Sequence, residues 1–332
     1  MNIDHIISRI YATVKNHELP EKGAYARWLW QNEKGSRKLG ANEYGCADAA
    51  NILYTIGAFP RENALREACV QQLQQFQDPE TGLFYEGTHH TIHCTAHCIA
   101  ALELFDAGPV YPLDGLSRHE TKEGLEELLE NLLWEESPWN NAHQGAGIYA
   151  AFVLTGKADP DWQDWYFGWL DKNADPDNGI SRRGAVQAGK LRAAHHLFGW
   201  FHYMFNYAFA RRPFPCAKAT VDTCIDLYKN NDLGDDFMRE INFCEIDWVY
   251  ALNRAAIQEN YRIDEARELM WDMAQKYIAY LEQVDVEKHE GWNDLHALFG
   301  VCCALAELQQ ALPGKIETSY PLKLVLDRRP FI

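Results

Sequence analysis

Apolar residues recur along this chain at the three- and four-residue spacing of an α-helix. Residues 61–73 carry their apolar side chains on one stripe and their charged side chains on the other, and residues 123–134 and 263–281 repeat this arrangement. Signals for β-strands are scarce, because no Asn-Gly or Asp-Gly turn is flanked by runs of alternating apolar residues. The pattern predicts an all-α protein.

Two kinds of helix alternate along the chain. Helices with one charged face, which suit contact with water, are predicted at residues 2–15, 61–76, 121–134, 161–170, 215–228 and 264–281. Helices that are apolar nearly all round, which is typical of complete burial, are predicted at residues 46–56, 91–105, 142–154, 195–209, 244–256 and 292–308. A two-helix repeat of about 50 residues indicates a helical array, and six repeats close an α/α barrel. We expect one (α/α)6 toroid domain, a six-helical-hairpin barrel, over residues 1–332.

The connections between these helices repeat as well. Segments 77–84, 173–180 and 231–237 each combine Asp and Gly, two of them with Pro, and each ends on an apolar residue. Beyond the last predicted helix, Pro321 and Pro330 argue against a further long helix. We expect residues 312–332 to form a tail that packs on the outside.

Polar residues recur at the start of each predicted inner helix. One marker per helix gives intervals of 45, 51, 52, 51 and 47 residues for the series Asp48, His93, Gln144, His196, Asp247 and Asp294. Parallel inner helices bring their N-termini to one mouth, where convergent polar groups would line a pocket. The alternative for each acid is a helix cap or a first-turn carboxylate that complements the helix dipole.

Paired carboxylates at this mouth favour glycoside hydrolysis, which uses two acids across a cleft. The predicted catalytic residues are Asp48, Asp247, Glu245 and Asp294, with His93 and His196 positioning hydroxyls or moving protons. The predicted substrate-binding residues are Tyr44, His97, Trp139, His143, Gln144, Arg192, His195, Trp248, Trp292 and His296. Aromatic rings among them would stack on sugar rings at this mouth. Aromatic residues make up 13% of the chain.

The histidines leave other chemistry open. His93, His196 or His296 would also serve as acid or base in a sugar epimerase or lyase, with Arg192 binding a carboxylate. His93 and His97 stand four residues apart, as two zinc ligands do, but Cys94 occupies the position of the glutamate in the His-Glu-x-x-His motif. We therefore assign no metal and no cofactor. A non-catalytic binding or scaffold protein is the further alternative.

Residues 65–106 resemble the toroids of the terpenoid cyclase and protein prenyltransferase type. Gln77 to Phe84 is similar to their Gln, Gly and aromatic repeat, and residues 93–104 are similar to the inner helix that follows it. The resemblance implies the toroid fold, which six-hairpin glycosidases also adopt, but it implies no activity. The acidic motifs of terpenoid cyclisation are absent from the sequence.

Charge and cysteine content narrow the expected partners. A formal net charge of −17 argues against nucleic acid and against anionic membrane surfaces. The N-terminal residues carry Asp4 early and lack a signal-peptide pattern. Nine scattered cysteines suit buried thiols in a reducing compartment better than a disulfide framework. We expect a cytoplasmic protein that binds a small molecule or an oligosaccharide, with no nucleic acid or membrane partner.

Overall fold

The computed structural model describes residues 1–332, and it is all-helical. Helices form at all of the predicted positions, and no β-strand is present, only isolated β-bridges. The prediction of an all-α protein is therefore confirmed. No helix combines the length and the apolar character that a membrane-spanning segment requires.

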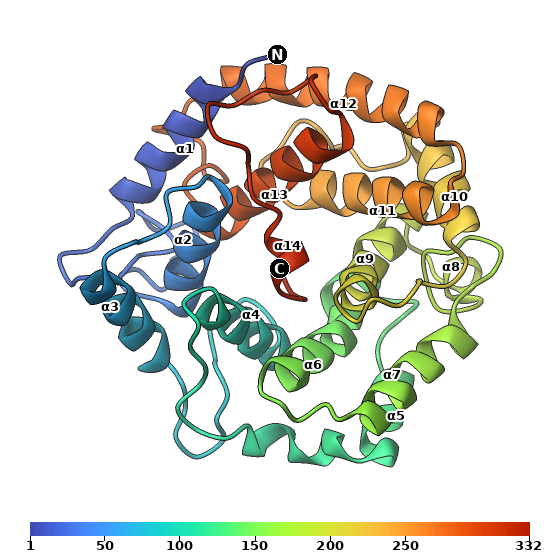
Figure 1. The fold of residues 1–332 in the computed structure, drawn as a ribbon, viewed down its shortest axis with the longest axis horizontal. Coiled ribbons are helices and arrows are strands. Elements are labelled where there is room, and N and C mark those ends of the chain that lie inside the picture. The colour runs from blue at the N-terminus through green and yellow to red at the C-terminus, as the bar shows by residue number, and fades with distance from the viewer.

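The helices with a charged face have only part of their surface buried. Along α12, for example, the buried residues follow the helical spacing from Ala266 through Met270 and Met273 to Leu281. The helices of this kind are α1 (Asp4–Asn16), α3 (Asn63–Gln74), α5 (Lys122–Glu130), α7 (Pro160–Asn173), α10 (Ala217–Lys229) and α12 (Ile263–Gln283). In Figure 1 they lie around the outside of the molecule.

The nearly uncharged helices are buried on most sides. In α4, every residue from Ile92 to Leu102 is buried. The helices of this kind are α2 (Glu43–Thr55), α4 (Thr91–Glu103), α6 (His143–Leu154), α9 (Ala193–Phe209), α11 (Cys244–Glu259) and α13 (Leu295–Ala311). Each contacts the next in the order α2, α4, α6, α9, α11 and α13, and α13 contacts α2. The six inner helices thus form a closed ring, which Figure 1 shows inside the outer helices.

Short helical segments occupy several connections. They are η1 (Asp114–Glu120), η2 (Pro138–Ala142), α8 (Ala185–Ala188) and α14 (Val325–Arg328). In the turn after α3, the Gln77 side chain donates to the carbonyl oxygens of Gly82 and Tyr111, each at 2.8 Å. Gly82 has a φ of 72°, and a Cβ there would meet the Pro112 carbonyl oxygen at 1.8 Å. The Gln and Gly of this turn therefore have a structural role.

The C-terminal segment runs to the centre of the ring, as Figure 1 shows. The Lys323 amide donates to the Thr55 carbonyl oxygen at the end of α2, at 2.8 Å. The Pro330 carbonyl oxygen accepts a hydrogen bond of 3.0 Å from Asn206 in α9. Phe331 and Ile332 are buried. An outer position was expected for residues 312–332, but burial of these two apolar side chains draws the last residues inward.

Candidate functional site

A central pocket of about 110 Å³ lies at the N-terminal ends of several inner helices. His93 stands in the first turn of α4, His143 is the first residue of α6, and His296 is the second residue of α13. The pocket is lined by His89, His93, Trp139, Asn140, His143, His202, Phe243, His296 and Ile332. Histidine is thus the dominant polar group of this pocket, and no carboxylate side chain lines it.

Three of these histidines converge and are called the three-histidine cluster below. His93, His143 and His202 come from α4, α6 and α9 and are only 3%, 5% and 5% exposed. One ring nitrogen from each lies within 4.8 Å of the others. The His93 and His143 ring centroids are 4.3 Å apart. Three successive helices of the inner ring therefore direct three imidazoles at one point.

Neighbouring groups fix the orientation of two of these rings. The His202 Nδ1–H donates to the Phe198 carbonyl oxygen one turn earlier, at 2.9 Å. His93 Nδ1 lies 2.8 Å from the Tyr44 hydroxyl. These bonds leave Nε2 of both rings without a protein partner, and the buried Nε2 of His143 has none either.

Burial disfavours the charged form of all three imidazoles. It lowers the pKa of His202 from 6.5 to about 4, and the carbonyl oxygen of Phe198 opposes this only in part. Burial, with repulsion from neighbouring imidazoles, takes the pKa of His93 and of His143 well below 6.5. The cluster therefore presents neutral rings at neutral pH.

A second group, the carboxylate cluster, consists of Asp48, His97 and His296, all buried. Asp48 in α2 accepts hydrogen bonds from His97 Nε2 at 2.8 Å and from His296 Nδ1 at 3.2 Å. Burial alone would raise the pKa of Asp48, but the two histidines outweigh it and hold this pKa below its ordinary value. Burial lowers the pKa of His296 to about 4, although Asp48 opposes the shift.

The spacing of His93 and His97 suggested two ligands of one ion, but the structure separates them. Their ring centroids are 6.4 Å apart, and each belongs to a different cluster. Tyr44 contributes to both, since its ring stacks on His97 at 4.7 Å while its hydroxyl meets His93.

Asp294 is tied into a structural network at the start of α13. It caps this helix by accepting from the His296 amide at 3.0 Å. Arg27 binds both of its oxygens, at 2.8 and 3.0 Å, and the Trp28 indole donates to it at 2.9 Å. Burial opposes ionisation of Asp294, but Arg27 outweighs it and lowers the pKa of this carboxyl. Asp294 therefore has the structural role of a helix cap, the alternative given above for these acids.

Glu245 and Asp247 lie buried in the first turn of α11 and do not line the pocket. Glu245 accepts from the Met238 amide at 2.6 Å, and burial raises its pKa to about 8. Neither carboxylate oxygen of Asp247 has a hydrogen-bond partner, and burial raises its pKa well above 3.8. These acids are not brought opposite Asp48 across an open cleft.

The other predicted binding residues are dispersed. Trp139 lines the pocket, with His195 beside it at a ring distance of 6.1 Å. Gln144 lines a separate cavity with His90 and His119. Arg192 is exposed and makes no side-chain hydrogen bond.

Three further predicted residues do not line the pocket and make their hydrogen bonds elsewhere. Trp248 donates to the Cys224 carbonyl oxygen of α10, at 2.9 Å. Trp292 donates to the Thr13 hydroxyl of α1, at 2.7 Å. His196 Nδ1 lies 3.1 Å from the Ser181 hydroxyl. The two tryptophans therefore pack against outer helices instead of forming a stacking surface at the mouth.

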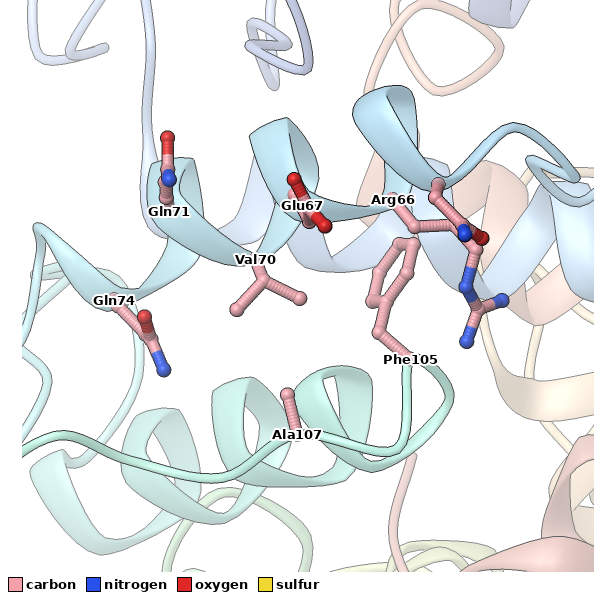
Figure 2. A pocket seen from close by; sticks show the side chains of 8 residues that line it. Arg66, Glu67, Val70, Gln71, Gln74, Phe105 and Ala107 are labelled. Carbon is pink, nitrogen blue, oxygen red and sulfur yellow. The ribbon is translucent and has the colours of Figure 1, made fainter.

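Larger cavities open on the outer surface. One of about 370 Å³ lies between α3 and the segment after α4, where Figure 2 shows Val70, Phe105 and Ala107 facing the gap. Its two charged lining residues are Arg66 and Glu67, and Arg66 pairs with Asp106 at 3.0 Å. No group of histidines or paired acids lines this cavity, so its size alone does not make it a catalytic site.

His202 and Ile332 line the pocket but were not expected there. His202 stands nine residues after the start of α9, away from the helix starts where the polar lining was expected. A histidine inside an otherwise apolar helix was the available signal. Ile332 was missed because the tail was expected outside.

Comparisons with known proteins identify no relative. No protein-family model, no curated protein and no solved structure matches this chain.

Proposed function

We propose that this chain is an enzyme of the (α/α)6 toroid class that acts on a small carbohydrate through histidine acid–base chemistry. The observation that carries the proposal is the central pocket, whose polar lining comes mainly from histidines on and before inner helices. The toroid assignment is supported by the closed ring of inner helices and by the outer helices around it.

The carboxylate cluster supplies the proton-transfer machinery. His296 lines the pocket, and its Nδ1–H donates to Asp48. This bond leaves Nε2 as the lone-pair nitrogen, which takes a proton from a bound substrate. The Asp48 carboxylate then stabilises the imidazolium that forms, as the carboxylate partner of a catalytic histidine does. Burial lowers the pKa of His296 to about 4, which keeps the ring neutral and its Nε2 lone pair free at neutral pH.

Pocket dimensions favour a substrate of one sugar ring or smaller. A volume of about 110 Å³ is well below the roughly 300–1,000 Å³ of pockets for larger ligands. Trp139 offers an aromatic surface and Asn140 an amide for hydroxyl groups. Hydrolysis by paired carboxylates requires two acids roughly 5–10 Å apart in a cleft, whereas no Asp or Glu side chain lines this pocket. The proposal therefore favours epimerase or lyase chemistry over glycoside hydrolysis.

Solvent isotope exchange tests this proposal directly. The purified protein is incubated in D₂O with a library of monosaccharides and uronic acids, and loss of C–H signals is followed by proton NMR. We expect exchange at one carbon of at least one sugar. His296→Gln and Asp48→Asn should each slow it by about 10²–10⁴-fold, the usual contribution of acid–base catalysis. His5→Gln, a change at an exposed histidine of α1, is the control and should leave the rate unchanged.

Two results would overturn the proposal. The first is exchange that His296→Gln leaves intact, because the base would then be another group. The second is a sugar that raises the melting temperature but neither exchanges nor reacts, which would indicate a binding protein.

A further inference from the structure

We propose that His93, His143 and His202 bind one divalent transition-metal ion, with zinc as the first candidate. The inference goes beyond the proposed function, because the site rests on the geometry of three rings and needs no assumption about the substrate. Only a catalytic use of the metal depends on the proposed function.

The ligand set is that of an open zinc site. Catalytic zinc takes three protein ligands, and three histidines are one of the recurring sets, with water or substrate in the fourth position. Bonds of about 2.0–2.1 Å in tetrahedral geometry place the ligand nitrogens roughly 3.4 Å apart. The three nitrogens lie within 4.8 Å of one another. Movement of these side chains by about an ångström therefore brings the three nitrogens to bonding distance of one ion.

The three rings have ring nitrogens available to an ion. Imidazole binds metal through the lone pair of a ring nitrogen that carries no proton, and the Nε2 atoms of all three rings have no protein partner. The unpartnered Nε2 of His143 lies in the interior, where an unmade hydrogen bond costs free energy. A bound cation gives this nitrogen a partner.

The surroundings also match a metal site. Histidine ligands commonly donate their second ring N–H to a carbonyl oxygen or carboxylate, which fixes the ring and its tautomer. The bond from His202 Nδ1 to Phe198 does this, and Tyr44 holds the corresponding atom of His93. The adjoining pocket leaves room for a fourth ligand.

The carboxylate cluster is a weaker candidate for the ion. Asp48 Oδ1 already accepts from two imidazole N–H groups, and a cation bound through this oxygen would displace both bonds, although Asp48 Oδ2 and His97 Nδ1 have no partner. The two clusters adjoin, since the His93 and His296 rings are 6.4 Å apart. An ion on the three-histidine cluster thus gains a nearby negative charge without taking Asp48 as a ligand.

Metal stoichiometry tests the site without any activity measurement. Purified protein is stripped with a chelator, titrated with Zn²⁺ by calorimetry and with Co²⁺ by visible absorption, and then measured by elemental analysis. We expect one equivalent per chain and a tetrahedral Co²⁺ spectrum. His143→Ala and His202→Ala should each weaken binding by at least tenfold. The matched control is His17→Ala, since His17 is equally buried and has an unpartnered Nε2, but lies outside both clusters.

Three results would overturn the inference. The first is no metal binding by the folded wild-type protein. The second is a loss of binding in His17→Ala equal to that in His143→Ala and His202→Ala. The third is a loss of binding in Asp48→Asn while His143→Ala and His202→Ala bind metal fully. If an alanine variant does not fold, His143→Gln and His202→Asn replace it, with circular dichroism as the check. Metal binding without isotope exchange would contradict the proposed function but leave the metal site intact. Isotope exchange by the metal-free protein would contradict only a catalytic role of the metal.

Discussion

Two groups of three buried side chains adjoin at the centre of the molecule, and they differ in how their polar atoms are satisfied. In the carboxylate cluster, the two imidazoles donate to Asp48 and hold its pKa below the ordinary value. In the three-histidine cluster, the rings face one another as neutral groups and no acid joins them. The first group is thus joined by hydrogen bonds through Asp48 Oδ1, although Asp48 Oδ2 and His97 Nδ1 lack partners, whereas the second has no internal hydrogen bond and, in our proposal, is completed by a metal ion.

The largest expected effect comes from removing the acid. Asp48→Ala leaves two buried N–H donors without an acceptor, at about 1–3 kcal/mol each, so we expect a loss of roughly 2–6 kcal/mol of unfolding free energy. Urea denaturation at neutral pH measures it. His143→Leu, which removes a nitrogen that has no partner, is the matched variant and should cost the metal-free protein less than about 1 kcal/mol. Equal losses in the two variants would erase the difference between the clusters.

Adding metal should stabilise the protein through the three-histidine cluster. At a free Zn²⁺ concentration one hundred times the dissociation constant, linkage predicts a gain of about 2.7 kcal/mol in unfolding free energy. Urea denaturation in zinc-buffered and chelator-containing solutions measures this gain. His143→Leu should abolish it. The same gain in that variant would show that the ion binds elsewhere.

Acid should destabilise the metal-free protein. Unfolded histidine binds its proton near pH 6.5, whereas folded His202 does so only near pH 4. Between these values the unfolded state holds more protons, so stability is full above pH 6.5 and falls as the pH drops toward 4. One such group lowers the free energy of unfolding by up to about 1.4 kcal/mol for each unit by which the pH falls in this range. Denaturation of wild type and His202→Phe at pH 7 and pH 5 should give a smaller loss in the variant; parallel losses would contradict the depressed pKa.

The smallest change concerns the support of His93. Tyr44→Phe removes the hydroxyl that meets its Nδ1 and should cost about 1 kcal/mol of stability. It should weaken metal binding by about 10–100-fold, as loss of a group behind a ligand does. Calorimetric titration with Zn²⁺ measures the affinity. Tyr54→Phe, at a partly buried tyrosine also on α2 but outside both clusters, is the control. Unchanged affinity in Tyr44→Phe would show that the hydroxyl does not support the ligand.

The helices were predictable from the sequence because their apolar spacing is local. Residues 91–105 and 244–256 were expected as inner helices, and α4 and α11 occupy them with shifts of only a few residues at their ends. The alternation of charged and uncharged helices also separated the outer helices from the inner ring. Tail placement was not predictable, because it depends on contacts with residues far away in the sequence, such as Asn206 with Pro330.

The site was predictable only in part. Position at a helix start was enough to select His143 and His296 for the pocket. It was not enough for Trp248, because the rotation of α11 about its axis directs this ring toward α10. His202 was missed for the same reason, since packing decides which residues in the middle of α9 face inward. Helix rotation is set by tertiary contacts, which periodicity alone does not specify.

Anomalous diffraction at the zinc absorption edge, from crystals grown with Zn²⁺, tests the central claim most directly. The account predicts one anomalous peak per chain, about 2.0–2.1 Å from a ring nitrogen of each of His93, His143 and His202, with the bonds from His97 and His296 to Asp48 intact. A peak held by Asp48, His97 and His296, or no peak between the three histidines, would contradict it.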